Sequence, residues 1–348
     1  MGERTHWIPA DAIGISAEQE EIKDTIKDKP TSKQEWAHFT PEFVNTHTPD
    51  VDLSSLNREV FTAQKNYQES RISQPDAKIK FDTDLPVTVF FVGDIHYGSI
   101  FTDTKKFVKE TKEILETPNA YIAFMANLID NAIPAQYPDS MLNNAIPPDK
   151  QVMGMRKFIQ ELDERGKVLG AVTSPCHEGW TWRHTGQDIN ALIFDYEGRN
   201  FPVMENGGSI KLQFPKSKYN MVLYHQIGPF RSNFNYTHGL KQMNRLRLGM
   251  SGDIVAGAHY HCGSVETVYE NLGDGKFKPV TYIQSGTYKG VGKINDRWAV
   301  DKYGAGAHPT AQSVTVWPSK RRMDAHLDFE TGMLAHEAHY IVEMAKRE

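Results

Sequence analysis

Residues 86–92 (PVTVFFV) form an unbroken run of β-branched and aromatic residues, and this run constrains the fold more than any other feature of the sequence. A run without polar alternation is typical of a strand buried on both faces, as in parallel sheets covered by helices. The residues that follow predict a helix over 103–116, a strand over 121–125, a helix over 149–164 and a strand over 167–172. This alternation predicts an α/β layered domain with an initially parallel sheet.

Later parts of the chain contain strand candidates with few helices between them. They cover residues 209–214, 219–225, 253–257, 264–270, 278–285 and 313–317. The segment 271–275 (NLGDG) is typical of a hairpin turn between two of these strands. We expect a second, mainly antiparallel sheet packed on the first, and a closing helix over 330–346.

The first 85 residues differ in composition from the rest of the chain. They carry 10 Lys and Arg against 16 Asp and Glu, whereas residues 86–348 carry 29 against 28. Ser16 and Gln19 fit a capping box that opens a charged helix over 16–28. We predict a partly helical, polar N-terminal extension over 1–85 and one domain over 86–348. The extension is either a surface-draped appendage or a docking arm for a protein partner.

Composition excludes several classes of protein. Two cysteines among 348 residues cannot supply a disulfide scaffold, so we expect a reducing compartment. The N-terminus lacks the layout of a signal peptide, and no apolar stretch reaches the roughly 20 residues of a membrane helix. We therefore expect a cytoplasmic protein with no membrane partner. The formal net charge of -5 gives no general attraction for nucleic acid, so a phosphate-bearing partner should meet the second part of the chain.

Polar side chains follow five of the predicted strands. The strands end in the segments 93–96 (GDIH), 126–131 (ANLIDN), 174–178 (SPCHE) and 259–262 (HYHC), and in His225. Ligands of α/β sheets bind beyond the carboxyl ends of the strands, and carboxylate, imidazole, amide and thiol groups are the ligands of transition metals. Taken singly, an Asp-x-His pair is more often a capped turn, and a lone His is more often a core residue. The order of the five segments along the chain is what favours a metal site over these ordinary explanations.

This order resembles the calcineurin-like metallophosphoesterase superfamily, in which G-D-x-H, G-D-x-x-D, G-N-H-E/D, an isolated His and G-H-x-H follow successive strands. Residues 93–96 match the first motif in full, and residues 176–178, His225 and 259–261 match the later motifs in order. The resemblance covers roughly residues 86–290. With the order of elements, it implies a four-layer α-β-β-α sandwich of two mixed sheets flanked by helices.

The resemblance also implies two divalent metal ions and a role for each motif residue. The implied metal ligands are Asp94, His96, Asn127, Cys176, His225, His259 and His261. His177 would protonate the leaving oxygen, and Glu178 and Asp130 would hold imidazoles by hydrogen bonds. Within the ligand set, Asp94, His96 and His261 belong to one ion. His225 and His259 belong to the other. Two cations about 3.5–4 Å apart lower the pKa of a shared water and hold phosphoryl oxygens for in-line attack.

The sequence departs from the family pattern at several positions. Asn127 replaces the bridging Asp, and Ala126 and Ala258 stand at glycine positions. A neutral amide bridges two cations poorly, so we expect the second ion to bind less tightly. Cys176 replaces a metal-binding Asn, and its thiolate favours Mn, Zn or Fe over Mg. Both cysteines, Cys176 and Cys262, lie in or beside a motif, although small buried cysteines are also common in cores.

Basic residues with interleaved aromatics lie between His225 and the last motif. We predict that Arg231, His238 and Arg245 contact the substrate, because arginine beside a metal pair suits phosphate and base recognition. The alternative is a solvated helix over 237–248 with a basic face. The glycine-rich segment 286–312 is predicted as a long loop over the site.

We therefore predict a metallophosphoesterase, a hydrolase that cleaves a phosphodiester of a nucleotide or nucleic acid, as a nuclease or phosphodiesterase does, with His177 as general acid. The layout is also similar to phosphoesterases encoded by bacteriophages or mobile elements. The alternative, from another class, is a catalytically weakened binding or assembly protein on the same scaffold, with residues 1–85 as its partner arm. Fold alone does not separate the two.

Overall fold

A computed structural model describes residues 52–70, 76–135, 138–226, 235–246, 248, 251–290 and 310–347. The chain divides into two compact units, Met1–Arg71 and Ile72–Glu348. The described part of the first unit is helix α2 (Leu53–Ser70), where the Asp52 carboxylate accepts a hydrogen bond from the backbone N–H of Ser54 at 3.0 Å. The charged helix expected over 16–28 lies outside the described residues.

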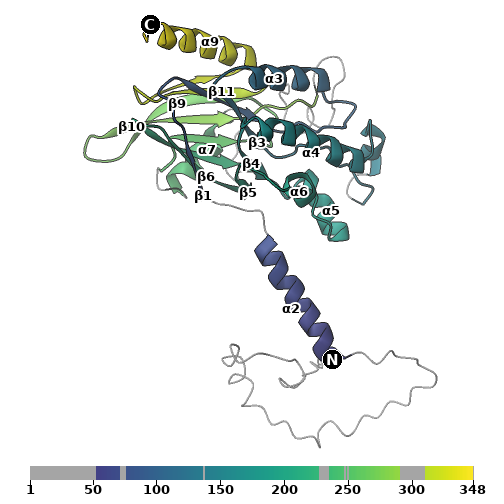
Figure 1. The fold of residues 1–348 in the computed structure, drawn as a ribbon. Coiled ribbons are helices and arrows are strands. Elements are labelled where there is room, and N and C mark those ends of the chain that lie inside the picture. The colour runs from purple at the N-terminus through teal and green to yellow at the C-terminus, as the bar shows by residue number, and fades with distance from the viewer. Residues whose placement is uncertain are drawn as a thin grey trace, which may run out of the picture. The chain divides into compact units, whose positions relative to one another are not determined.

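Two six-stranded sheets form the second unit (Figure 1). The first sheet has the order β12-β11-β2-β3-β4-β5, and the second has the order β1-β6-β7-β8-β10-β9. The strands of the first sheet are β2 (Val87–Val92), β3 (Ala120–Met125), β4 (Val168–Thr173), β5 (Val203–Glu205), β11 (Gln312–Trp317) and β12 (Arg322–His326). Those of the second are β1 (Asp76–Lys80), β6 (Gly207–Gln213), β7 (Lys218–Tyr224), β8 (Ile254–Gly257), β9 (Ser264–Asn271) and β10 (Phe277–Gln284).

Helices cover the outer face of each sheet. The helices of this unit are α3 (Thr104–Glu116), α4 (Pro148–Glu164), α5 (His177–Thr185), α6 (Ile189–Phe194), α7 (His238–Leu246), α9 (Phe329–Ala345) and the 3-10 helix η3 (Pro138–Asn143). Helices α3, α4 and α9 contact the first sheet, and α7 contacts the second. The predicted four-layer α-β-β-α sandwich is confirmed. No helix in the described ranges combines the length and apolar character needed to cross a membrane.

Strand direction explains how the two sheets differ from the prediction. Strands β2 to β5 run parallel, and β11 and β12 are antiparallel additions. In the second sheet β1–β6, β7–β8 and β8–β10 are parallel, and only β6–β7 and β9–β10 are antiparallel. The second sheet is thus mixed, as the predicted sandwich of two mixed sheets requires, and not mainly antiparallel, and α7 is the crossover that makes β8 parallel to β7.

The compact α/β unit starts before residue 86. Strand β1 pairs parallel with β6 in a register that runs from Asp76 opposite Ser209 to Lys80 opposite Gln213. It forms an edge of the second sheet, so residues 76–80 belong to the domain and not to the extension. A short edge strand with alternating charges (DAKIK) gives almost no signal in the sequence, since only one of its faces contacts the core.

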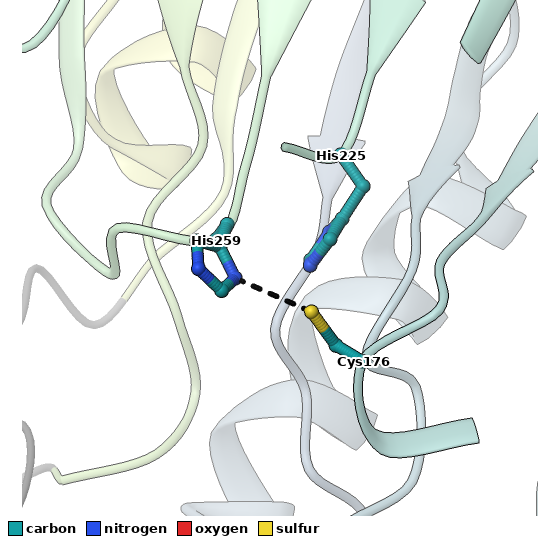
Figure 2. Close-up of side chains that lie close together, drawn as sticks. All are labelled: Cys176, His225 and His259. Atoms are coloured by element: carbon teal, nitrogen blue, oxygen red, sulfur yellow. Dashed lines mark hydrogen bonds between the residues drawn. The ribbon is translucent and has the colours of Figure 1, made fainter. Parts of the chain in front are cut away.

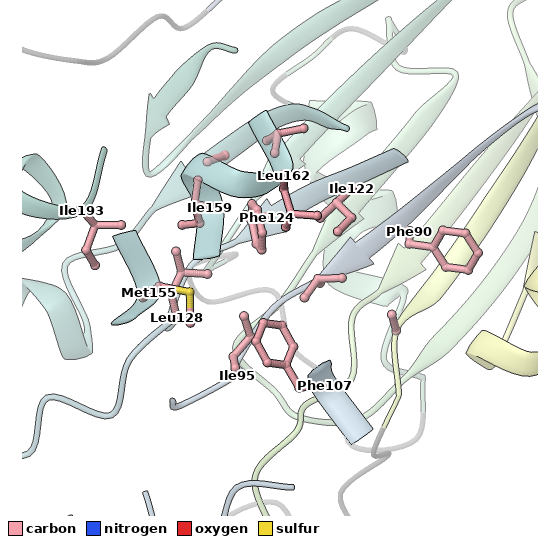
Figure 3. Close-up of a cluster of buried hydrophobic side chains, with 14 of the residues drawn as sticks. Phe90, Ile95, Phe107, Ile122, Phe124, Leu128, Met155, Ile159, Leu162 and Ile193 are labelled. Atoms are coloured by element: carbon pink, nitrogen blue, oxygen red, sulfur yellow. The ribbon is translucent and has the colours of Figure 1, made fainter. Parts of the chain in front are cut away.

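Alternating side chains of the same strand fill two different apolar layers. Phe90 and Val92 of β2 pack with Phe107, Ile159 and other side chains between the first sheet and its helices (Figure 3). Val89 and Phe91 point to the opposite face and pack against the second sheet. The period of two explains why every residue of β2 is buried, as the apolar run predicts.

A third apolar layer lies under α7. Leu240 and Met243 of that helix pack on Val255, Val280 and Tyr282 of the second sheet. The neighbouring β8 residues Ile254 and Ala256 face the layer between the two sheets instead. Three apolar layers between four layers of secondary structure leave the strand ends as the place where polar groups can gather.

The hairpin predicted at 271–275 joins β9 to β10, which are antiparallel in register. Gly273, Asp274 and Gly275 have φ of 89°, 50° and 69°, so the turn needs residues that tolerate the left-handed region. Helices α5 and α6 were not predicted. They are short, and α5 carries Gly179 and four threonine or tryptophan positions that weaken any helical pattern.

A buried carboxyl group joins α3 to the segment that follows β10. Glu110 Oε2 accepts a hydrogen bond from Tyr288 Oη at 2.5 Å, and Lys106 Nζ lies 3.5 Å from Glu110 Oε1. Burial raises the pKa of Glu110 to about 7, although the Tyr288 hydroxyl and Lys106 act in the opposite direction. Folding therefore favours the protonated carboxyl group.

We expect the free energy of unfolding to fall between about pH 4.5 and pH 7, because the unfolded chain loses the Glu110 proton first. The stability is fully present below the unfolded pKa, and about 3 kcal/mol is lost once pH passes the folded pKa. In urea unfolding at pH 5 and pH 8, Glu110→Gln should remove this part of the difference in the free energy of unfolding between the two pH values. Glu113→Gln, at an exposed position of the same helix, is the matched control. An equal change in the free energy of unfolding with pH in wild type and Glu110→Gln would contradict the prediction that the folded state favours protonated Glu110.

Candidate metal centre

Loops after β2, β3, β4, β7 and β8 bring the predicted ligands to one edge of the two sheets. In each sheet the strands concerned run parallel, so their carboxyl ends lie side by side. Backbone hydrogen bonds join the loops: Asp94 N–H donates to the Ala126 carbonyl at 3.0 Å, and His96 N–H donates to the Asn127 carbonyl at 3.0 Å. Residues that are far apart in sequence are thus fixed next to one another.

Gly93 lets the two sheets approach each other beside these loops. A Cβ atom at this position would lie 2.7 Å from Met125 Cβ and 3.2 Å from Ala258 Cβ. Met125 ends β3 in the first sheet, and Ala258 follows β8 in the second. Close packing therefore requires the glycine before Asp94. This packing brings Asp94 of the first sheet next to the ligands of the second sheet.

Asp94, His96 and His261 form the first ligand group, and all three are buried. The Nε2 atoms of His96 and His261 are 3.2 Å apart, and Asp94 Oδ1 lies 3.5 Å from His261 Nε2 and 3.9 Å from His96 Nε2. The edge of a tetrahedron of nitrogen ligands around Zn²⁺ is about 3.3 Å. The spacing of these atoms fits the shell of one small divalent cation.

Cys176, His225 and His259 form the second ligand group, with ligand atoms within 4.8 Å of one another. Figure 2 shows the three side chains pointing toward one another from three separate segments. Cys176 Sγ lies 3.8 Å from His259 Nδ1. His225 Nδ1 donates to the Met125 carbonyl at 2.7 Å, so its Nε2 atom carries a lone pair. That Nε2 atom is buried without a hydrogen-bond partner among the described residues.

Asp94 and Asn127 lie between the two groups. Asp94 Oδ2 accepts the backbone N–H of His259 at 2.6 Å, while Oδ1 accepts the amide of Asn127 at 2.9 Å. Asn127 Oδ1 is buried, and within the described part of the chain no group donates to it. Leaving a buried acceptor unsatisfied costs about 1–3 kcal/mol. Two such atoms beside one carboxylate fit a place that cations would fill.

The backbone at these loop residues is strained. A non-glycine residue in the left-handed region costs on the order of 1–3 kcal/mol, and such residues cluster at functional sites. Seven residues of these loops have positive φ: Asp94 (47°), His96 (52°), Ala126 (61°), Asn127 (48°), Asn131 (43°), His259 (79°) and His261 (60°). Ala126 occupies the position where the family pattern has glycine, so the left-handed turn is kept although the residue type has changed.

Burial and neighbouring charge set the protonation of the ligands. Burial alone would raise the pKa of Asp94, but His261, His225 and His96 outweigh it and hold that pKa below its usual range. Burial lowers the pKa of His225, so its imidazole is neutral and can bind a cation. Burial raises the pKa of the Cys176 thiol, with Asp94 and Glu178 adding to the effect. A bound cation would be needed to make it a thiolate at neutral pH.

His177 lies at the first turn of α5, beside the first ligand group. Its Nδ1 atom donates to the backbone carbonyl of Asp130 at 2.5 Å, and its ring stacks at a tilt on Trp180 with centroids 3.9 Å apart. The ring is 12% exposed, whereas that of His96, 4.4 Å away between centroids, is fully buried. Burial and the neighbouring His96 hold the pKa of His177 well below its usual value. Nε2 is the nitrogen left for a transferable proton.

His96, Asp130 and His177 are also close enough to hold a cation. We assign them to hydrogen bonding instead, because Lys289 Nζ already lies 2.7 Å from Asp130 Oδ1. The same oxygen is 3.1 Å from His96 Nδ1, so Asp130 contacts an imidazole. Glu178 does not. Its Oε1 atom accepts the backbone N–H groups of Leu128 at 2.6 Å and Ile129 at 3.4 Å, and burial raises its pKa to about 7.

Two of the three predicted substrate contacts, His238 and Arg245, lie among the described residues. Arg245 donates to both carboxylate oxygens of Glu270, at 2.9 and 3.2 Å, so its charge is neutralised on the surface of the second sheet. Glu270 lies six residues along β9 from Ser264, which is about 20 Å from the ligand end of the sheet. This ion pair places Arg245 away from the ligand loops, and its role in substrate binding stays a prediction. His238 starts α7, and Arg231 lies outside the described residues.

Sequence reasoning missed Lys289. It follows β10 and lies far from every motif, and only the topology brings its ammonium group to Asp130. The preceding residues QSGTY give no signal for a site lysine. Residues 291–309 of the predicted long loop are outside the described part of the chain.

Comparison with known proteins adds no assignment. The sequence matches no family model, and no curated protein matches it significantly. The geometry of the site therefore carries the functional argument.

We expect Co²⁺ to give a thiolate-to-cobalt charge-transfer band in the ultraviolet, because Cys176 Sγ lies among the second ligand group. Cys176→Ser should abolish the band and weaken binding at this group by at least about tenfold, or about 1.4 kcal/mol. Cys262→Ser is the matched control, since Cys262 is the other cysteine of the chain and packs against Tyr260. A band that persists in Cys176→Ser and disappears in Cys262→Ser would contradict the ligand assignment.

Proposed function

We propose that this protein is a metal-dependent phosphoesterase of the calcineurin-like type. The observation that carries the proposal is the pair of ligand groups joined by Asp94, with His225 Nε2 and Asn127 Oδ1 both buried and without a hydrogen-bond partner among the described residues. Two adjacent groups of three donors each are typical of dinuclear hydrolases. A purely structural core has no reason to retain this many unsatisfied polar atoms.

The ligand atoms suggest which cations bind. The first group offers one carboxylate oxygen and two imidazoles, and the second offers a thiol and two imidazoles. Imidazole and thiolate favour Zn, Fe or Mn over Mg, which prefers oxygen ligands. Cations at the two groups would lower the pKa of water and withdraw charge from phosphoryl oxygens. The neutral amide of Asn127 should make the second cation the more weakly held of the two.

The chain's own residues have distinct tasks in this proposal. Asp94 is held at both oxygens, by Asn127 and by the His259 backbone, so its orientation is fixed before any substrate binds. His177 is aligned by Asp130 and Trp180 and presents Nε2 as the donor to the leaving oxygen. An anionic phosphate ester beside Nε2 would favour the protonated imidazole, so binding and protonation of the acid are coupled.

A phosphodiester of a nucleotide or nucleic acid is the proposed substrate class. Partly exposed aromatic and basic groups lie near the ligand loops: Trp182 on α5 is half-exposed, and Tyr236 packs against Tyr260 and Cys262 beside His261. Aromatic faces near a phosphate site suit stacking of bases.

A non-catalytic binding or assembly protein is the second candidate. One observation favours it: Asn127, in the bridging position, donates its amide to Asp94 instead of offering a second carboxylate. The half-exposed apolar residues of α2, Leu53, Leu56, Val60 and Phe61, also fit the hypothesis of a protein partner for the extension. Turnover decides between the two candidates.

We expect the protein as purified to contain up to two equivalents of Mn, Zn or Fe and to hydrolyse bis(p-nitrophenyl) phosphate. His177→Ala should lower kcat by about 100- to 10,000-fold while metal content stays unchanged, because general-acid catalysis contributes roughly that factor. His184→Ala, an exposed histidine on the same helix, is the matched control. Absence of turnover in wild type with every added divalent cation would favour the binding protein.

Asn127→Asp should bind the second cation at least about tenfold more tightly, which corresponds to about 1.4 kcal/mol. The added carboxylate faces Asp94, so the metal-free variant should unfold at a lower temperature than wild type, and added cation should reverse the difference. Calorimetric titration and thermal unfolding with and without metal measure both effects, and hydrolytic activity should rise. Unchanged metal affinity would show that Asn127 does not face the cations.

A further inference from the structure

We propose that Lys289 is a positioning residue for the first ligand group: its ammonium group fixes the Asp130 carboxylate, which in turn orients His96 toward Asp94 and His261. The inference rests on the proposed metal centre and deepens it. It assigns a role to a residue outside every sequence motif. It also assigns the carboxylate of the cluster His96, Asp130 and His177 to hydrogen bonding.

The backbone around Lys289 is clamped to the loop that follows β2. Tyr288 N–H donates to the carbonyl of Asp94 at 3.2 Å, and Gly290 N–H donates to the carbonyl of Phe101 at 3.0 Å. Lys289 itself forms an antiparallel bridge with Thr102. Its side chain is 12% exposed, far less than that of an ordinary surface lysine. These backbone contacts therefore hold the ammonium group of Lys289 close to the first ligand group.

One carboxylate oxygen connects Lys289 to the metal ligand. Asp130 Oδ1 lies 2.7 Å from Lys289 Nζ and 3.1 Å from His96 Nδ1. His96 therefore donates its Nδ1 proton to Asp130 and turns its Nε2 lone pair to His261 Nε2, 3.2 Å away. Carboxylates that orient a ligating histidine in this way change metal affinity by 10- to 100-fold when they are lost.

Charge explains why the carboxylate needs the lysine. The Asp130 side chain is 2% exposed, and a buried carboxylate without a cationic partner is strongly disfavoured. Lys289 supplies a fixed positive charge without competing for a coordination position. Asp130 is thereby kept as an acceptor for the imidazole.

The test is a cobalt titration of the full-length protein, with calorimetry for total binding and the thiolate charge-transfer band for the second group. The variants are Lys289→Met, which removes the charge, and Lys289→Arg, which keeps it. Lys278→Met is the matched control. Lys278 forms a comparable partly buried pair with Asp253 at 3.0 Å, and Asp253 precedes β8, at the opposite end of the sheet.

We expect Lys289→Met to weaken binding at the first group by 10- to 100-fold and to leave the charge-transfer titration of the second group unchanged. Lys289→Arg should stay within about threefold of wild type, and Lys278→Met should match wild type at both groups. A general loss of structure would instead reduce binding at both groups together. First-group affinity in Lys289→Met equal to that of wild type would overturn the inference and leave the metal centre intact.

Two further outcomes are distinguishable. Absence of cobalt binding by wild type would overturn the proposed metal centre and, with it, the role of Lys289. If Lys289→Met does not fold, as judged by circular dichroism, Lys289→Gln replaces it, because Gln keeps a hydrogen-bond donor without the charge. The expected result for Lys289→Gln is the same selective loss at the first group, and wild-type affinity there would refute the inference.

Discussion

The carboxylate of Asp94 is the interaction on which the rest of the site depends. It is fully buried at the end of β2, and its two oxygens are held by the Asn127 amide and the His259 backbone. These contacts join the loop after β3 in the first sheet to the loop after β8 in the second. Both sheets must pack closely at Gly93 for this to happen, so the sandwich and the site are formed by one set of contacts.

Burial makes this arrangement costly unless something compensates it. The site combines an anionic carboxylate, neutral imidazoles, a thiol and two unsatisfied buried atoms with several residues in strained backbone conformations. Desolvation of such groups opposes folding, and cations held by both ligand groups would offset it. The desolvation of Asp130 is offset differently, because the ammonium group of Lys289 is its partner within the protein. The two neighbouring carboxylates are thus balanced in different ways.

Residues that differ from the pattern of the resembled family bear unequally on the proposed site. Ala126 has a φ of 61°, so the left-handed turn at this position is present without a glycine. Cys176 places a soft donor beside two imidazoles, and soft donors favour Zn or Fe over Mg. Asn127 places a neutral amide beside Asp94 where the resembled pattern has a carboxylate, and the proposed catalytic role depends most directly on this position. Basic residues of helix α7 form ion pairs with acidic residues of β9. Their charge is therefore balanced at the surface of the second sheet and not at the ligand groups.

The sequence by itself determined four strands of the first sheet, β2, β3, β4 and β11, and the helices α3, α4 and α9, because apolar runs and helical patterns are local. It also indicated the candidate ligands at the strand ends, with His225 and His259 as one set, but only through the order of the motifs along the chain. Tertiary structure decided the rest. Edge strand β1 and the pairing of Arg245 with Glu270 depend on distant partners, as does the placement of Lys289 against Asp130. A contact between segments 159 residues apart leaves no local trace, since each residue looks ordinary until the fold brings them together.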